Sequence, residues 1–192
     1  MDLNWGELIV GQLEFYWDAH LWPRLDGLTD EEYFWEPVDG CWSVRRDEDG
    51  LWKMDKAWPI PEPEAVTTIA WRMMHIAVEC FATRASAFFG DDSDGLGDEA
   101  NMWDPRRGPA SMAGSAADAL ALLDESYRRW HDGTAALDPH GLAKPLGVRG
   151  ADFAESPMAD LILHINRETM HHGAEIGVLR DLYRAGYPGA KG

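Results

Sequence analysis

The sequence has no long apolar run and few cysteines, and each absence excludes a class of protein. No uninterrupted apolar stretch approaches the ~20 residues of a membrane-spanning helix, so we expect no membrane partner. The two cysteines, Cys41 and Cys80, are far apart and form no CxxC or metal-ligand spacing, which suits a reducing cytoplasm. The opening residues, MDLNWGELIV, carry acids and no basic flank, unlike a secretory signal. We therefore expect a cytoplasmic protein.

Basic residues are also scarce. Lysine and arginine number 17 against 34 acidic residues, a formal net charge of −17. Because the nucleic acid backbone is bound by clusters of lysine and arginine, this balance predicts no nucleic acid partner. Apolar residues make up 45% of the 192-residue chain, as in a globular protein, and no break requires a second domain.

Helical periodicity dominates the chain and is interrupted by loops rich in proline and glycine. The pattern predicts long helices over residues 3–25, 67–89, 115–137 and 156–185. A capping-box pair, Thr29 and Glu32, predicts a further short helix. The segments CWSVRR and LWKMDK flank the turn sequence DEDG and are expected to form a small hairpin. Residues 1–192 are thus predicted to form one all-α domain, a four-helix bundle with long irregular loops and one small hairpin.

The last predicted helix places ionisable groups on the side that should face the core. Its buried stripe is predicted from apolar spacings of three and four residues, and its members are Met158, Leu161, Ile165, Thr169, His172, Ile176, Leu179 and Tyr183. His172 lies within this stripe, and Glu168, four residues earlier, lies on its edge. A carboxylate in such a position is costly unless it is paired, hydrogen-bonded or bound to a metal.

A third candidate residue lies on the second predicted helix, where His75 borders the apolar stripe. A lone histidine there is more often a hydrogen-bonded core residue than a ligand, but Glu168 and His172 also point inward without an evident partner. Residues four apart share one helix face, so both could reach one ion at about 2.0–2.2 Å, with His75 closing the site from the facing helix. We therefore expect the ligand atoms of these three residues to converge within about 4 Å of one another.

The pattern resembles a known superfamily. A histidine on the second helix, followed by HINRETMHHGAEIGVLRD on the last, resembles the DinB/YfiT-like metal-binding four-helix bundles. Most of these carry three histidine ligands, and Glu168 stands at the position of the middle one. The His-Glu-His version is similar to the actinobacterial branch that includes the mycothiol-dependent maleylpyruvate isomerase N-terminal domain, as is the segment LTDEEYFWEPVDGCWSVR. The resemblance implies that His75, Glu168 and His172 ligate a divalent metal.

The resemblance also implies a chemistry. Three protein ligands leave one coordination position open, as in catalytic zinc sites. The implied activity is a metal-dependent S-transferase or isomerase, in which the metal activates a small-molecule thiol, mycothiol as co-substrate, toward an electrophilic substrate. Zinc is the first choice of metal, with nickel and iron as alternatives. The isomerase has an additional C-terminal domain, whereas this sequence stops at Gly192, so that particular isomerisation is not implied.

Other functions stay open at this point. The bundle could be a non-catalytic, stress-related metal-binding protein, a water-activating metallohydrolase, or an iron protein, since two histidines and one carboxylate also suit Fe(II). The sequence leaves the oligomeric state open, a homodimer included. His164 is expected beside the metal ligands and outside their set; if it were a fourth ligand, the site would be closed and structural. Arg167 and Arg180 are expected on the surface, and neither cysteine has a histidine beside it in the sequence.

Overall fold

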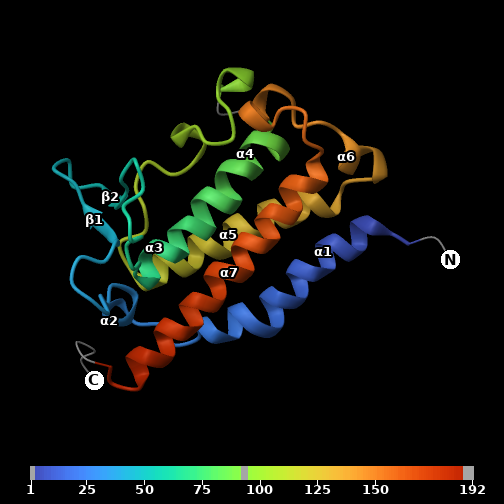
Figure 1. Ribbon diagram of the computed structural model, residues 1–192. Coiled ribbons are helices and arrows are strands. Elements are labelled where there is room, and N and C mark those ends of the chain that lie inside the picture. The colour runs from blue at the N-terminus through green and yellow to red at the C-terminus, as the bar shows by residue number, and fades with distance from the viewer. Residues whose placement is uncertain (1–2, 92–94, 188–192) are drawn as a thin grey trace.

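The computed structural model describes residues 3–91 and 95–187, and its four long helical stretches confirm the predicted bundle (Figure 1). The first stretch is α1 (Trp5–Tyr16), which continues through a π-helical turn (Trp17–Leu21) and a 3-10 turn (Trp22–Leu25). The second joins α3 (Ile69–Met74), a π-helical segment (His75–Ala82) and α4 (Thr83–Phe89). The third and fourth are α5 (Ala116–Ala135) and α7 (Met158–Arg184).

Polar caps fix where these helices begin, because the first N–H groups of a helix lack partners within it. The hydroxyl of Thr68 accepts a hydrogen bond from the backbone of Trp71 at the start of α3. Ser115 caps α5, as its sequence predicts. Thr29 accepts a hydrogen bond from the Glu32 amide and opens the short helix α2 (Asp30–Tyr33), which confirms the capping box.

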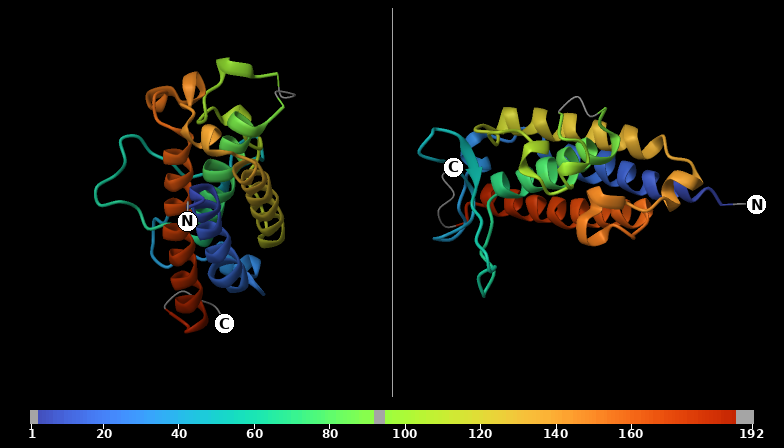
Figure 2. Two further views of the ribbon diagram at one scale, coloured as in Figure 1. Left: turned by 90° about the vertical axis from the view of Figure 1, so that its right-hand side faces the viewer. Right: turned by 90° about the horizontal axis from the view of Figure 1, so that it is seen from above.

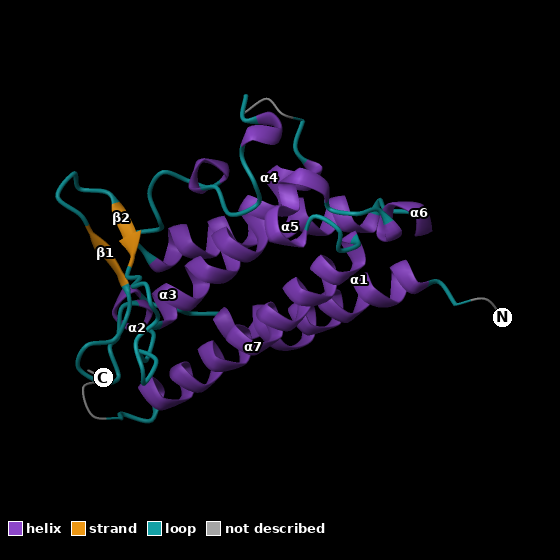
Figure 3. Ribbon diagram, turned by 45° about the horizontal axis from the view of Figure 1, so that its top comes forward, coloured by secondary structure: helices purple, strands orange, loops and turns teal. Residues whose placement is uncertain are grey.

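The predicted hairpin is present at one end of the bundle. Strands β1 (Val44–Arg46) and β2 (Trp52–Met54) pair antiparallel, and Figure 3 shows them near α2 and the start of α3. Short helices interrupt the loops: α6 (Pro139–Ala143) and 3-10 turns at Gly97–Glu99, Pro105–Arg107 and Gly147–Phe153. The two further views show the hairpin and α6 at opposite ends of the long helices (Figure 2). Across residues 3–91 and 95–187, no helix has both the length and the apolar character needed to cross a bilayer.

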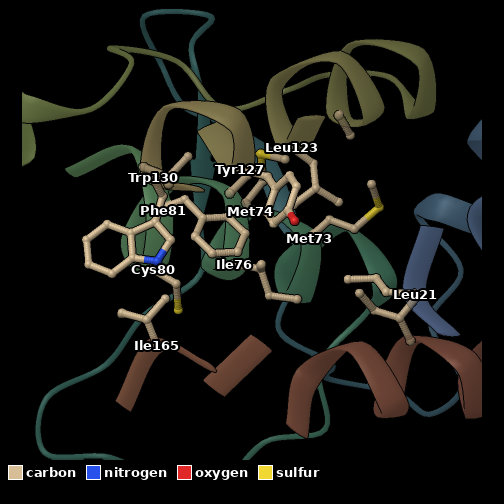
Figure 4. Packing of buried hydrophobic residues seen from close by; sticks show 14 of the residues in the cluster. Leu21, Met73, Met74, Ile76, Cys80, Phe81, Leu123, Tyr127, Trp130 and Ile165 are labelled. Carbon is tan, nitrogen blue, oxygen red and sulfur yellow. The ribbon is translucent and has the colours of Figure 1, made fainter. Parts of the chain in front are cut away.

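The second helix lies at the centre of the core. Its predicted stripe is buried from Met74 to Ala85, and neighbouring positions such as Ile76 and Ala77 are fully buried as well. It packs against α5 on one side and α7 on another. Figure 4 shows its side chains meeting those of the other long helices, among them Leu21, Leu123, Tyr127, Trp130 and Ile165. A helix buried on most sides is apolar on most sides, so any charged residue on it requires an explanation.

One prediction about α7 is wrong. Arg180 was expected on the surface, but it is fully buried and forms a two-bond ion pair with Glu32 of α2, with nitrogen–oxygen distances of 2.7 and 2.9 Å. Its guanidinium also donates to the carbonyls of Arg24 and Asp26, at the end of the first helical stretch. A planar guanidinium can satisfy several acceptors at once, which allows this charge to be buried. Arg167 is exposed, as predicted.

Candidate metal centre

The structure brings the three predicted residues together between the second helix and α7. His75 is the first residue of the π-helical segment, while Glu168 and His172 lie one turn apart in the middle of α7. The Glu168 Oε2 atom is 3.6 Å from Nε2 of His75 and 3.4 Å from Nε2 of His172. All three ligand atoms lie within 4.8 Å of one another, close to the expected separation of about 4 Å.

This geometry fits a divalent metal. Ligands bound tetrahedrally at about 2.1 Å lie about 3.4 Å from one another, which matches the two distances to Glu168. The Nε2 atom of His75 is buried and has no hydrogen-bond partner. A buried polar atom without a partner is costly, and a metal ion at the centre of the three residues would satisfy it. Two imidazoles and one carboxylate form a donor set that zinc and other divalent first-row metals accept.

A second layer of carboxylates holds the two imidazole rings. His75 Nδ1 lies 2.8 Å from a carboxylate oxygen of Glu79, and His172 Nδ1 lies 2.7 Å from one of Glu175. When Nδ1 donates its proton to a carboxylate, the lone pair of Nε2 remains free for a metal. Glu79 forms an ion pair with Lys56, and Glu175 forms one with Arg72. Each histidine is therefore supported by a carboxylate that is itself held by a cation.

The charges of the site favour a cation at its centre. Burial lowers the pKa of His75, but interactions with Cys80, Glu168 and Glu79 outweigh burial and raise it to about 11. The interaction with His75 lowers the pKa of Glu168 to about 2. Burial, followed by the charge of His75, lowers the pKa of His172 to about 4. Near neutral pH, the metal-free site therefore holds one proton on His75 beside an ionised Glu168, and a metal must displace that proton.

Two of the three residues, His75 and Glu168, border a cleft of about 970 Å³. Its walls come from the second helix, the strand β2, the loop around residues 103–112 and α7. Within the described ranges, no fourth histidine, cysteine, aspartate or glutamate joins the group of three. His164 lies on the cleft wall, with its Nδ1 3.8 Å from the outer oxygen of Glu168 and 2.9 Å from Arg167. His164 thus lies beside the group of three and is not part of it.

Sequence reasoning missed three of the residues around the site. Glu79 and Glu175 follow their histidines by four and three residues, so helical spacing alone could have identified them as partners. Cys80 could not be found this way. It borders the cleft and lies close enough to His75 to raise the pKa of that histidine, although the two residues are not adjacent in the sequence. The π-helical segment, with its wider turn, brings residues five apart onto one side.

Comparison with known proteins agrees with this geometry. No curated protein and no solved structure matches the chain. A family model, that of the DinB superfamily, matches residues 12–176, which include His75, Glu168 and His172. The match covers most of the chain and includes at least part of each of the four long helical stretches, and the chain therefore belongs to the DinB superfamily.

Proposed function

We propose that this protein is a divalent-metal-dependent enzyme that transfers a small-molecule thiol to an electrophilic substrate, or uses that thiol to isomerise the substrate. The observation that carries the proposal is the buried Nε2 of His75, which makes no hydrogen bond and faces Glu168 and His172 at the edge of a large cleft. Zinc is the proposed metal and mycothiol the proposed thiol. The actinobacterial His-Glu-His branch is the proposed position within the superfamily.

The cleft supports catalysis over a purely structural role. A structural zinc site is closed by four protein ligands, whereas three ligands beside a cleft leave room for a reactant. His164 would have been the fourth ligand of a closed site, yet its ring is 44% exposed and its Nδ1 lies near Arg167. These observations favour the enzyme over the non-catalytic metal-binding bundle.

The residues of the chain have separate tasks in this proposal. His75, Glu168 and His172 would hold the metal, and Glu79 and Glu175 keep the two rings turned with Nε2 toward it. The metal, when bound, would supply Lewis acidity that lowers the pKa of a thiol. In the transfer, the thiol loses its proton to water, a carbon–sulfur bond forms, and the bond between that carbon and the leaving group breaks, so that the leaving group departs with the bonding electrons. Apolar side chains of the cleft, including Val78, would exclude water from the reactants.

The test begins with the metal. The purified full chain should bind one zinc per protein, and elemental analysis measures this directly. Thiol transfer from mycothiol to chlorodinitrobenzene, followed by absorbance, should depend on zinc, stop after chelation and return when zinc is restored. Glutathione serves as the comparison thiol, and a chromogenic ester tests for a metallohydrolase instead. His75→Ala should lose both metal and activity, whereas His140→Ala, on the exposed surface of α6, should lose neither.

The same experiment can refute the proposal. Protein that stays metal-free after exposure to zinc, nickel and iron would exclude every metal-dependent function. Ester hydrolysis without thiol transfer would replace the transferase with a hydrolase. Bound zinc with neither activity would return the protein to the class of non-catalytic metal-binding bundles.

A further inference from the structure

The cleft contains a buried arginine that the proposed metal chemistry does not use. Arg84 lies on α4, nine residues beyond His75 on the same continuous helix, and it lines the same cleft. Only 7% of its surface is exposed. A guanidinium is rarely buried to this extent without a carboxylate partner, because removing the charge from water is costly.

The partners of Arg84 do not account for its charge. Its Nη1 donates one hydrogen bond to the hydroxyl of Thr83 (2.9 Å), and its guanidinium carbon lies 5.8 Å from the centre of the Trp103 ring. Its Nε is buried without a hydrogen-bond partner. Within residues 3–91 and 95–187, no carboxylate lies at ion-pair distance from Arg84. Four of its five N–H groups thus have no protein acceptor in that part of the chain.

The other cations of the cleft differ from Arg84 in this respect. Lys56 is paired with Glu79, Arg106 with Asp104, and Lys53 donates to the carbonyl of Ala110. Among the lining cations in the described ranges, Arg84 alone has neither an acidic nor a carbonyl partner. A buried guanidinium without an acidic partner attracts an anion, and the interaction is stronger at a buried position than in water.

We propose that Arg84 binds the carboxylate of the ligand that occupies the cleft, so that the substrate class is a small organic acid. One end of this molecule carries the carboxylate, and the other carries the thiol or electrophilic carbon that reacts at the metal end. Only the chemical identity of this second end rests on the proposed function. A singly charged carboxylate fits better than a phosphate, because the cleft offers one unpaired cation and also contains Glu79 and Glu168.

The position of Arg84 sets the length of such a ligand. Nine residues of α-helix would span about 13 Å. The wider π-helical turn between His75 and Arg84 rises less per residue, and helical side chains lean toward the N-terminus, so the guanidinium lies closer to His75 than that. The remaining distance suits a molecule with a short apolar stem between its two reactive ends. The side chains of Val78, Met112 and Ile165 on the cleft wall would contact that stem.

The test compares two probes that differ only in charge. Mercaptohexanoate and mercaptohexanol are titrated into the full chain by calorimetry, both zinc-loaded and after chelation. The wild-type protein should bind the acid about 10- to 100-fold more tightly than the alcohol, the range for a hydrogen bond to a charged group. Arg84→Gln should reduce this ratio to about one, and Arg84→Lys, which keeps the charge, should give an intermediate ratio. Arg128→Gln, at an exposed position of α5, is the matched control and should keep the wild-type ratio.

The outcomes separate this inference from the proposed function. Zinc stoichiometry and the circular dichroism melt should be the same in Arg84→Gln and wild type, which excludes misfolding as the cause of a lost preference. An acid preference that survives chelation and disappears in Arg84→Gln supports the inference, even if the wild type binds no zinc and the proposed function fails. A protein that binds zinc but does not distinguish the two probes would overturn it. A preference that Arg84→Gln leaves unchanged would overturn it as well.

Discussion

Zinc binding should release one proton at neutral pH, and this number follows from the charges of the site. In the metal-free protein His75, with its pKa raised to about 11, carries a proton. His172, with its pKa lowered to about 4, and Glu168, with its pKa lowered to about 2, do not. A metal needs the lone pair of His75 Nε2, so it must displace that one proton. Zinc affinity should accordingly rise about tenfold per pH unit between pH 6 and 8.

Calorimetry in two buffers measures this release. The observed binding enthalpy changes with the ionisation enthalpy of the buffer, and the slope gives the number of protons transferred. A slope of about one is expected at pH 7. Glu79→Gln should reduce it, because that variant removes one of the carboxylates that stabilise the charged His75. Zinc binding with no proton release at pH 7 would show that His75 is neutral in the free protein, and the electrostatic account of the site would be wrong.

The same pKa shift affects the stability of the metal-free protein. Because the folded pKa of His75 lies above its ordinary value of 6.5, protonation favours the folded state. This stabilisation is fully present below pH 6.5 and is lost as the pH rises toward about 11. Zinc replaces the proton, so the stability of the zinc-loaded protein should depend less on pH over this range.

Three further variants test the ligand set, its support and the fold. Glu168→Gln should leave the metal-free protein folded and lower zinc affinity, measured by competition with a chelator, by more than about 100-fold, because an amide is a poor ligand. Glu79→Gln should lower zinc affinity by about 10- to 100-fold, and an unchanged affinity would show that the carboxylate does not orient His75. Glu32→Ala should lower the free energy of unfolding in urea by about 3–5 kcal/mol, because it leaves Arg180 buried and unpaired. The exposed control Arg128→Ala should cost at most about 1 kcal/mol.

The fold could be predicted from the sequence because its main signals are local. The apolar members of the predicted α7 stripe from Met158 to Leu179 are buried in the structure, and the cap at Ser115 identified the start of α5. Glu168 and His172 were found for the same reason, since four-residue spacing fixes their common face. His75 required the additional assumption that the second helix packs against α7, and the structure confirms that packing.

The features that were missed depend on contacts between distant segments. The burial of Arg180 depends on Glu32, which precedes it by 148 residues. The support of His75 includes Lys56, from the loop after the hairpin. Periodicity gives each helix a buried face but cannot say which charged residue of another segment meets it. A polar residue next to a buried stripe, such as Arg180, is therefore assigned to the surface by default.

The π-helical segment His75–Ala82 determines the angle about the helix axis between His75 and Arg84, which lie at the two ends of the cleft. In an uninterrupted α-helix, nine steps of about 100° would turn Arg84 about 180° away from His75, to the opposite side. The wider π turn advances by only about 80° per residue, which sets the two residues within about 50° of each other. Deleting one residue from this segment would remove one step of about 80°, which would rotate Arg84 by that angle relative to His75 and leave every proposed metal ligand in place. The number of residues in the segment, as well as their identity, therefore determines which ligand can reach both ends of the cleft.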